Sequence, residues 1–524
     1  MTHPTPTNYK FGQERDSIMD IQGFVSVILL YVVACWMAIE APVARAGDPF
    51  AGIDPYIGAA LEKWQVPGLA IAVVKDGEVV LARGYGLCEI GTGRKVTADT
   101  AFNVASCEKS FVATCVGQLG DEGKLRWDDP VAKHLDGFEL ADAYLTEHAT
   151  LRDLLCHRTG LRRADLLGDG AGFETQGVLR RLKYIEPIAE LRTKYIYNNH
   201  MYTVLGEVVA RVSGKPYQQY VAEHILQPLE MRSSTFRAAD LPPDRIAPRH
   251  WRSDAGIVAR PVGAGLHSTV RDMAHWLQLQ LAEGKYGDRR LLQSETIREM
   301  HTMQFSIPVR SRRRHNIYSA QFLGSGLGWQ IQDYRGHKIV SHGGSWGAMV
   351  AMMPEKDVGI VVLSNLDLEY LASLLMYDVF DAYLVGPETT WSPDKWDATW
   401  LRNEPPGNAY RPRDEAKSRL EKLRMVDTTP SLPLEKYTGT FDSKLYGRLV
   451  VRRNGASLSV NFGEFTTEMS HWEDDSFYVR TPTRLTFDWL LTFGVSNDGK
   501  TTSVSVKHVG WDSDEKDHVF VRAQ

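Results

Sequence analysis

Strand-forming segments stand at the two ends of one long stretch of this chain, with mainly helical patterns between them. At the first end, the apolar runs 69–74 and 78–82 flank an Asp-Gly pair, which is a strong signal for a hairpin turn. At the other end, the segments 337–340, 348–353 and 358–363 also have the pattern of strands. This order predicts an α/β domain whose single sheet is assembled from both of its ends.

A second, smaller domain is predicted where the composition changes. Residues 386–433 are rich in Pro, Trp and charge, and we expect a linker with one short helix there. From 434 to 524, short strand patterns alternate with turns such as Asn454-Gly455. The expected strands are 437–441, 449–451, 458–460, 477–479, 485–487, 503–506 and 519–521. Regular short strands predict a small antiparallel barrel or sandwich, which we treat as accessory because no nucleophile constellation lies in it.

The N-terminal 46 residues have the features of a targeting segment. Residues 23–39 are apolar and contain no charged side chain, and Ala44-Arg45-Ala46 supplies a small-residue cleavage signal. We therefore expect a signal peptide over 1–46 and an exported, periplasmic or secreted protein. An uncleaved membrane anchor is the alternative. The larger domain would then span 47–385.

Composition and cysteine usage exclude several classes of protein. A formal net charge of −5 argues against a nucleic-acid partner, and the basic cluster at 310–314 is expected to be a solvated loop. The four cysteines after the targeting segment are too few for a disulfide scaffold: Cys88, Cys107, Cys115 and Cys156. No Cys-x-x-Cys or His-Glu-x-x-His motif is present, so we expect no metal and no other cofactor.

A serine and a lysine are three residues apart in the tetrapeptide 106–109, where a strand-like run gives way to a helical one. At this spacing on a helix, Ser106 and Lys109 lie on one face within contact range. The lysine can then be the base that activates the serine as a nucleophile. Two other Ser-x-x-Lys matches, 392–395 and 513–516, lack this context, because the first contains a proline directly after its serine and the second is turn-like.

Two later segments carry residues that complete a site. Tyr197 and Asn199 form a Tyr-x-Asn pattern before an amphipathic helix, and a strand-like run ends in His-Gly-Gly at 342–344. With these motifs the chain resembles the penicillin-recognising serine hydrolases, in the branch of class C β-lactamases, DD-peptidases, D-aminopeptidases and related esterases. The family's motifs Ser-x-x-Lys, Tyr-x-Asn and Lys/His-x-Gly occur here in the family's order. The segments 151–161 and 264–272 resemble further family landmarks.

The resemblance covers roughly residues 55–384 and implies a fold. The β-lactamase-like fold is an antiparallel sheet flanked by helices, with a separate helical region. The C-terminal piece is similar to the small all-β barrel domain that is appended to many members.

The resemblance, together with the chemistry of the side chains, implies their roles. Ser106 would attack a carbonyl and form an acyl-enzyme, while Lys109 and Tyr197 would share the proton transfers. Asn199 would hydrogen-bond the substrate amide or hold Lys109 in place.

The third motif would supply the surface on which the substrate lies. The backbone N–H groups of Ser106 and Ser345 would form the oxyanion hole. Gly344 would let a substrate backbone lie against the strand, since no Cβ is in the way. His342 would contact the carboxylate or carbonyl side of the substrate.

The substrate class follows from a departure in the third motif. Class C β-lactamases usually carry Lys-Thr-Gly where this chain has His-Gly-Gly, and histidine is a weaker, pH-dependent cation near neutrality. We therefore expect a serine peptidase or amidase that cleaves short linear or D-residue-containing peptides. A carboxylesterase or a weak β-lactamase is the alternative on the same fold, and a non-catalytic penicillin-binding or sensor protein is the alternative of another class. The expected partner is a small peptide or ester, with a membrane only if the N-terminal segment stays uncleaved.

Two glycine-rich segments are weaker candidates. Residues 343–347 match the Gly-x-Ser-x-Gly nucleophile elbow, but that motif must be followed by a helix, and 348–353 has the pattern of a strand. The run 324–328 lacks the strand and helix of a nucleotide-binding loop and is expected to be a flexible turn.

Overall fold

The computed structural model describes most of the chain after residue 47. The described residues are 48–523 without 170, 254–255, 261, 310–319, 368–370, 393–416, 419, 464, 482–487 and 510–516. The expected signal peptide or anchor, the basic cluster at 310–314 and most of the expected linker lie outside them, so these expectations stay predictions. Among the described residues, no helix is both long and apolar enough to cross a membrane.

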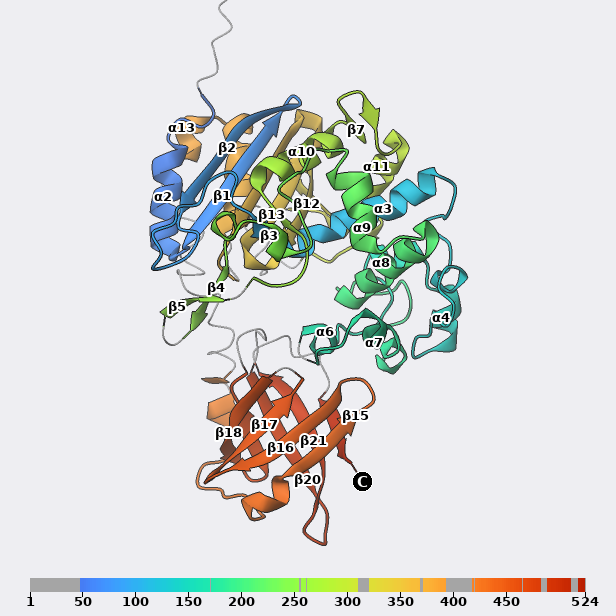
Figure 1. Cartoon of the computed structure of the whole chain (residues 1–524), viewed down its shortest axis with the longest axis vertical. Coiled ribbons are helices and arrows are strands. Elements are labelled where there is room, and N and C mark those ends of the chain that lie inside the picture. Colours follow the sequence, from blue (N-terminus) through green and yellow to red (C-terminus); the bar gives the residue numbers. More distant parts are fainter. Residues whose placement is uncertain are drawn as a thin grey trace, which may run out of the picture. The chain divides into compact units, whose positions relative to one another are not determined.

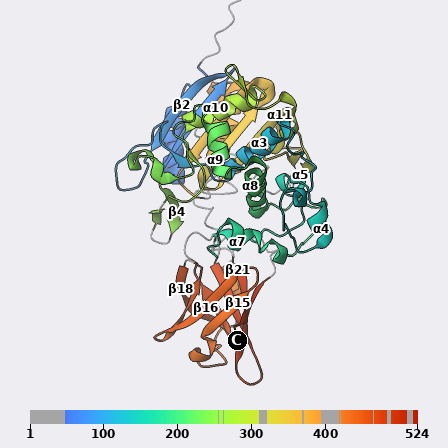
Figure 2. The same ribbon diagram turned by 45° about the vertical axis from the view of Figure 1, so that its right-hand side comes forward.

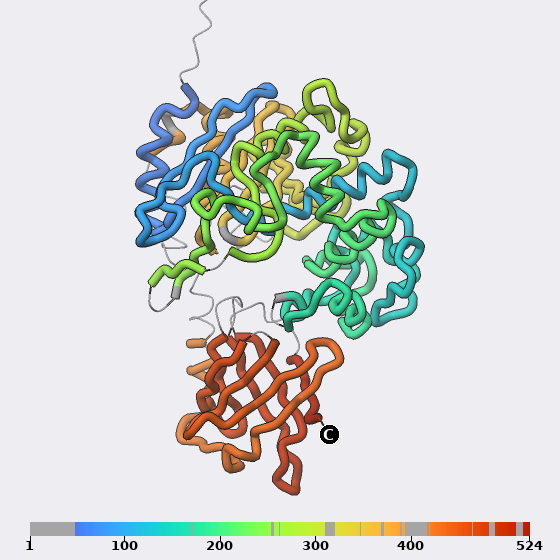
Figure 3. The backbone as a smooth tube through the Cα atoms, in the orientation of Figure 1, coloured from blue at the N-terminus to red at the C-terminus, as the bar shows by residue number. Residues whose placement is uncertain are grey.

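An antiparallel sheet of eight strands forms the centre of the larger domain (Figure 1). Its order is β2-β1-β14-β13-β12-β11-β10-β9. The bounds are β1 Gly68–Lys75, β2 Glu78–Gly86, β9 Phe305–Ser306, β10 Leu323–Ser325, β11 Gln330–Tyr334, β12 His337–Gly344, β13 Ala348–Met353 and β14 Val358–Ser364. In Figure 3 the blue N-terminal strands run beside the yellow and orange ones, and β1 pairs with β14 from Leu69↔Ser364 to Lys75↔Val358. The prediction of one sheet built from both ends is confirmed.

Helices cover both faces of this sheet. Strands β13 and β14 are buried along their whole length, which requires cover on both sides. Val361 and Leu363, alternate residues of β14, share a core cluster with Trp276 and Leu277 of α10 (Val270–Leu281). Helix α12 (Leu371–Leu384) packs on β13 and β14 but lies outside that cluster, so it covers the opposite face.

Most of the remaining helices come from the stretch of chain between the two sets of strands. Helix α3 (Glu108–Asp121) packs against α8 (Asn199–Ser213), and this contact later brings two site residues together. The other helices are α2 Ile53–Trp64, α4 Ala143–His148, α5 Leu151–Leu155, α6 Leu166–Asp169, α7 Thr175–Leu179, α9 Tyr217–Val221, α11 Ser294–Met300 and α13 Pro387–Thr390. Three short pairs complete the domain: β3 Phe102–Asn103 with β6 His267–Ser268, β4 Arg249–Ser253 with β5 Gly256–Arg260, and β7 Lys285–Tyr286 with β8 Arg289–Arg290.

The C-terminal strands close into an antiparallel barrel (Figure 2). Its strands are β15 Gly439–Ser443, β16 Gly447–Asn454, β17 Ser457–Phe462, β18 Phe465–Glu473, β19 Ser476–Val479, β20 Asp488–Val495, β21 Thr501–Val509 and β22 His518–Arg522. Of the two predicted architectures the barrel is confirmed and the sandwich is wrong. Strands β18 and β20 were not predicted; few side chains of β18 are apolar. The strand expected at 485–487 lies outside the described residues.

The four cysteines that the structure describes are all buried and unpaired: Cys88, Cys107, Cys115 and Cys156. This confirms that they do not form a disulfide scaffold. The domain limits at 385/386 and 433/434 stay predictions.

Candidate active site

Ser106 lies in a turn of 3-10 helix, Ala105–Cys107, that continues directly into α3. Lys109 is in the first turn of α3, and its Nζ donates a hydrogen bond to Ser106 Oγ at 3.2 Å. The lysine is buried, with 8% of its surface exposed, whereas the serine is half-buried. A partly accessible hydroxyl is therefore in direct contact with a buried amine, as neighbours three residues apart on a helix can be.

The backbone before Ser106 is held in an uncommon conformation. Ala105 has a left-handed φ of 48°, which residues with a Cβ rarely adopt, and Asn103 Oδ1 accepts its N–H at 3.0 Å. Val104 N donates to Leu266 O at 3.0 Å, so a second segment holds the same turn from the side. Strain that its surroundings enforce next to a reactive group is a reason to consider a functional site.

The end of β12 approaches this turn at Gly344. A Cβ added to Gly344 would lie 2.8 Å from Val104 O and 3.0 Å from Ala105 Cβ, so a side chain there would displace one of the two segments. The following turn, Ser345–Gly347, contacts the turn that holds Ser106. The two backbone N–H groups expected to form the oxyanion hole therefore belong to turns that are in contact.

Tyr197 stands two residues before the start of α8, and the packing of α8 on α3 brings it to Lys109. The Lys109 Nζ lies 5.0 Å from the centroid of the Tyr197 ring. A second cation, the guanidinium of Arg163, lies 5.2 Å from the same ring. The half-buried ring of Tyr197 thus lies near both the amine of Lys109 and the guanidinium of Arg163, within the distance range of contacts between nitrogen groups and aromatic rings.

Asn199, the first residue of α8, has its amide engaged elsewhere. Its Nδ2 donates to Asp165 Oδ1 at 3.1 Å, and Asp165 also pairs with Arg163 at 2.8 Å. No hydrogen bond joins Asn199 to Lys109 among the residues that the structure describes. Of the two expected roles for Asn199, contact with the substrate amide is the one this geometry leaves open.

His342 in β12 is buried and held as a neutral donor. Its Nδ1 lies 2.8 Å from Gly328 O, and because a carbonyl only accepts, Nδ1 must carry the proton. Burial first, and then the charge of Lys109, lower the pKa of His342 to about 4. The imidazole is therefore uncharged near pH 7, and this strand position lacks the positive charge that a lysine would supply there.

Gly328 is a residue of the site that sequence reasoning missed. Its φ is 80°, and an added Cβ would lie 2.9 Å from Lys109 O and 2.6 Å from Ala113 Cβ. Residues 324–328 are buried, the first two of them lie in strand β10, and Gly328 fits against α3, so the expected flexible turn is wrong. The repeated glycines were a usable signal, because glycine in such a run often marks a close approach of two backbones.

A second missed residue is His157, whose ring centroid lies 4.2 Å from that of Tyr197. It falls in the segment 151–161, which the sequence marks as a family landmark without assigning any role to a residue in it. The contact between His157 and Tyr197 joins residues far apart in sequence, so no local sequence pattern predicts it.

The serine of the elbow motif, Ser345, lies in a different local structure from Ser106. Ser345 is followed by β13, a strand, so the absence of a nucleophile elbow is confirmed. Lys395 and the segment 513–516 lie outside the described residues.

Comparison with known proteins places the site in a family context. The Beta-lactamase family model matches residues 53–377, and the model described as Domain of unknown function (DUF3471) matches residues 423–522. The protein named Unguisins hydrolase ungD' of Aspergillus campestris is 27% identical over 441 residues, which are 78% of this chain and 78% of that protein.

Two solved structures share the fold. The octameric penicillin-binding protein homologue from Pyrococcus abyssi has a TM-score of 0.57 at 24% identity and covers 89% of this chain and 99% of its own. EstCE1, described as a hydrolase with promiscuous acyltransferase activity, has a TM-score of 0.54 at 21% identity and covers 63% of this chain and 98% of its own. At these identities the likeness concerns the fold alone.

Proposed function

Because the chain belongs to the Beta-lactamase family, we propose that it is a serine hydrolase that acts through an acyl-enzyme on Ser106. The observation that carries this proposal is the hydrogen bond of 3.2 Å from Lys109 Nζ to Ser106 Oγ, with the ring of Tyr197 beside the lysine. A hydroxyl in contact with an amine that can accept its proton is the arrangement of an activated nucleophile.

The proposed reaction has two halves. Ser106 Oγ attacks the carbonyl carbon as its proton passes to the Lys109–Tyr197 pair, and the same pair returns a proton to the leaving amine or alcohol. The N–H groups of Ser106 and Ser345 stabilise the negative oxygen that forms. Water then attacks the acyl-enzyme and releases the acid, which restores the free hydroxyl of Ser106.

We infer that the substrate is a short peptide, linear or containing D-residues, and that the enzyme is a peptidase or amidase. The neutral state of His342 supports this class, because the motif position of the strand that would hold the substrate carries an uncharged side chain and no lysine to demand a carboxylate. The name of the relative Unguisins hydrolase ungD' assigns hydrolysis of unguisins to that protein and agrees with a hydrolase here. A carboxylesterase is the second candidate, because the same neutral His342 admits esters equally well.

A hydrolysis screen of the full chain tests this proposal. It compares L- and D-aminoacyl amides, p-nitrophenyl esters, a cephalosporin and linear peptides, with Ser106→Ala beside wild type and Ser345→Ala as the matched control. We expect turnover of peptides or amides that is lost in Ser106→Ala and retained in Ser345→Ala. Turnover of esters alone would favour the carboxylesterase. Absence of turnover with every substrate would favour a binding or sensor protein.

A further inference from the structure

His157 holds Tyr197 by three contacts. Its carbonyl oxygen accepts the N–H of Ile196 at 2.8 Å, and its ring Nδ1 accepts the N–H of Asn198 at 3.1 Å. Its imidazole ring lies 4.2 Å from the Tyr197 ring, tilted by 35°. One residue therefore binds the backbone N–H groups of both chain neighbours of Tyr197 and also packs on its ring.

From these contacts we propose that His157 is a positioning residue, which sets the place of the Tyr197 phenol relative to Lys109 and Ser106. The inference rests on the proposed function, because it matters only if Tyr197 takes part in proton transfer. Catalysis tolerates little displacement of such a group, so a contact on each side of the tyrosine has a direct use.

The chemistry at the other ring nitrogen argues against a role in packing alone. His157 is buried, with 3% exposed, and its Nε2 has no hydrogen-bond partner among the described residues. A buried polar atom without a partner is unfavourable, so an apolar side chain would pack at this place at less cost. What an apolar side chain lacks is an acceptor for the N–H of Asn198.

The surroundings of His157 keep its imidazole neutral, which is the state in which Nδ1 can accept the N–H of Asn198. Burial, followed by the charges of Lys109, His342 and Arg163, holds the pKa of His157 well below its ordinary value. The rings of Tyr195 and Tyr202 also face it, at 5.7 and 5.2 Å between centroids. A neutral imidazole whose Nδ1 accepts carries its proton on Nε2, whereas a charged one has no acceptor.

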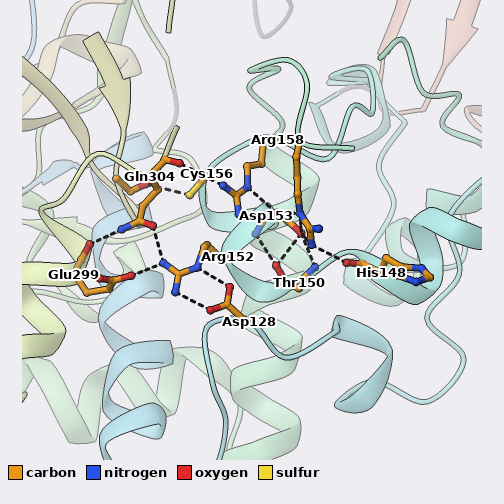
Figure 4. A network of polar contacts seen from close by, with 11 residues as sticks. Asp128, His148, Thr150, Arg152, Asp153, Cys156, Arg158, Glu299 and Gln304 are labelled. Carbon is orange, nitrogen blue, oxygen red and sulfur yellow. Dashed lines mark hydrogen bonds and ion pairs between the residues drawn. The ribbon is translucent and has the colours of Figure 1, made fainter. Parts of the chain in front are cut away.

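Both chain neighbours of His157, Cys156 and Arg158, belong to the network of polar contacts in Figure 4. His157 has a left-handed φ of 57° and is the second residue after the end of α5. The carboxylate of Asp153 in α5 is fully buried and accepts from Thr150 N at 3.0 Å, from Arg158 Nε at 2.6 Å and from Arg192 Nε at 3.0 Å. Arg158 N also donates to Asp153 O at 3.0 Å, so the chain is held on both sides of the histidine.

Two substitutions in the full chain separate the acceptor from the ring. In His157→Asn the side-chain oxygen can replace Nδ1 as the acceptor, whereas His157→Phe keeps a ring and has no acceptor. The readout is the rate at which a fluorophosphonate labels Ser106, together with kcat and KM for an ester or amide that wild type turns over. We expect His157→Asn to stay within about tenfold of wild type, and His157→Phe to lose about 100-fold in labelling rate and kcat with little change in KM.

The matched control is His250→Phe. His250 is a buried histidine whose Nε2 accepts the N–H of Ile90 at 3.3 Å, in a part of the chain that supplies no residue of the site. Its labelling rate should equal that of wild type. If His157→Phe does not give a cooperative thermal unfolding transition, His157→Ala replaces it in the same comparison, since it removes the acceptor without adding bulk.

The labelling experiment tests the role of His157 and the proposed function separately. Labelling of His157→Phe at the wild-type rate would overturn the inference, and so would equal losses in the Asn and Phe variants. If Ser106 of wild type is not labelled at all, the proposed function fails instead, and the two failures are thereby distinguished.

Discussion

Among single residues, Lys109 is the one on which the proposed chemistry depends most. In the part of the chain that the structure describes, it is buried without a carboxylate ion pair, and its hydrogen bond goes to Ser106. Its neighbour Glu108 is a carboxylic acid whose pKa burial raises, and Glu108 accepts a hydrogen bond from Leu266 N at 3.0 Å. Among the described residues, therefore, no ion pair with a carboxylate draws the amine of Lys109 away from Ser106.

Replacing Lys109 by methionine keeps much of the side-chain volume and removes the amine. We expect kcat/KM to fall by about 10²–10⁴-fold, the usual contribution of a positioned acid or base. The control is Lys124→Met, because the side chain of Lys124 is half exposed and pairs with the exposed Glu122. Activity of Lys109→Met at the level of Lys124→Met would show that another group takes the proton from Ser106.

The buried His342 predicts a pH dependence of stability. Its pKa of about 4 in the folded chain lies below the ordinary value of 6.5, so between these values the unfolded chain binds more protons. The neutral histidine therefore contributes fully above about pH 6.5, and this contribution is lost as pH falls towards 4. Between pH 7 and pH 5 the unfolding free energy of wild type should fall by about 2 kcal/mol more than that of His342→Asn. Denaturant titrations at both pH values measure this, and equal losses in the two proteins would contradict it.

At the scale of elements, the site depends on how closely β12 approaches the turn before Ser106. The two glycines at the end of β12 differ in this respect, which gives a matched pair of variants. A Cβ at Gly344 meets backbone at 2.8 Å, whereas a Cβ at Gly343 meets the end of the Met349 side chain at 3.4 Å and the nearest backbone atom, Ala348 O, at 4.0 Å.

We expect Gly344→Ala to cost about 1–3 kcal/mol of unfolding free energy, because overpacking against backbone forces a shift. Gly343→Ala should stay within about 0.5 kcal/mol of wild type, since a methionine end can move aside. Chemical denaturation of the two variants measures the difference. Equal losses would mean that β12 does not approach the nucleophile turn as closely as described.

Elements that carry a local pattern could be predicted from the sequence. The Asp-Gly hairpin, the strands 337–340, 348–353 and 358–363, and the barrel turns follow from short-range chemistry, and the spacing of Ser106 and Lys109 follows from one helical turn. Three contacts of the site could not be predicted. They are the hydrogen bonds of His157 to the chain around Tyr197, the close packing of Gly328 against α3, and the hydrogen bond from Asn199 to Asp165. Each of these joins segments far apart in sequence, and only tertiary packing determines them.

At the scale of the whole molecule, we interpret the barrel as an accessory domain that supplies no residue to the reaction of Ser106. A change that destabilises the barrel should therefore leave that reaction unchanged. Phe462 is fully buried in the barrel core, and Phe462→Ala should cost about 3–5 kcal/mol of stability in that part. Labelling of Ser106 by a fluorophosphonate should keep its wild-type rate.

The contrasting variant is Phe111→Ala, which removes a buried ring of α3 that stacks on Trp276 at 3.9 Å. It should slow labelling, because α3 carries Lys109. Slow labelling in Phe462→Ala at a temperature where the chain is still folded would assign the barrel a part in the site.

The central claim, that Ser106 forms the acyl-enzyme, is tested most directly by the intact mass of the protein after exposure to a fluorophosphonate or a penicillin. We predict one added group, located on Ser106 by peptide mapping, present in wild type and Ser345→Ala and absent from Ser106→Ala. An adduct that persists in Ser106→Ala, or that maps to Ser345, would contradict the account.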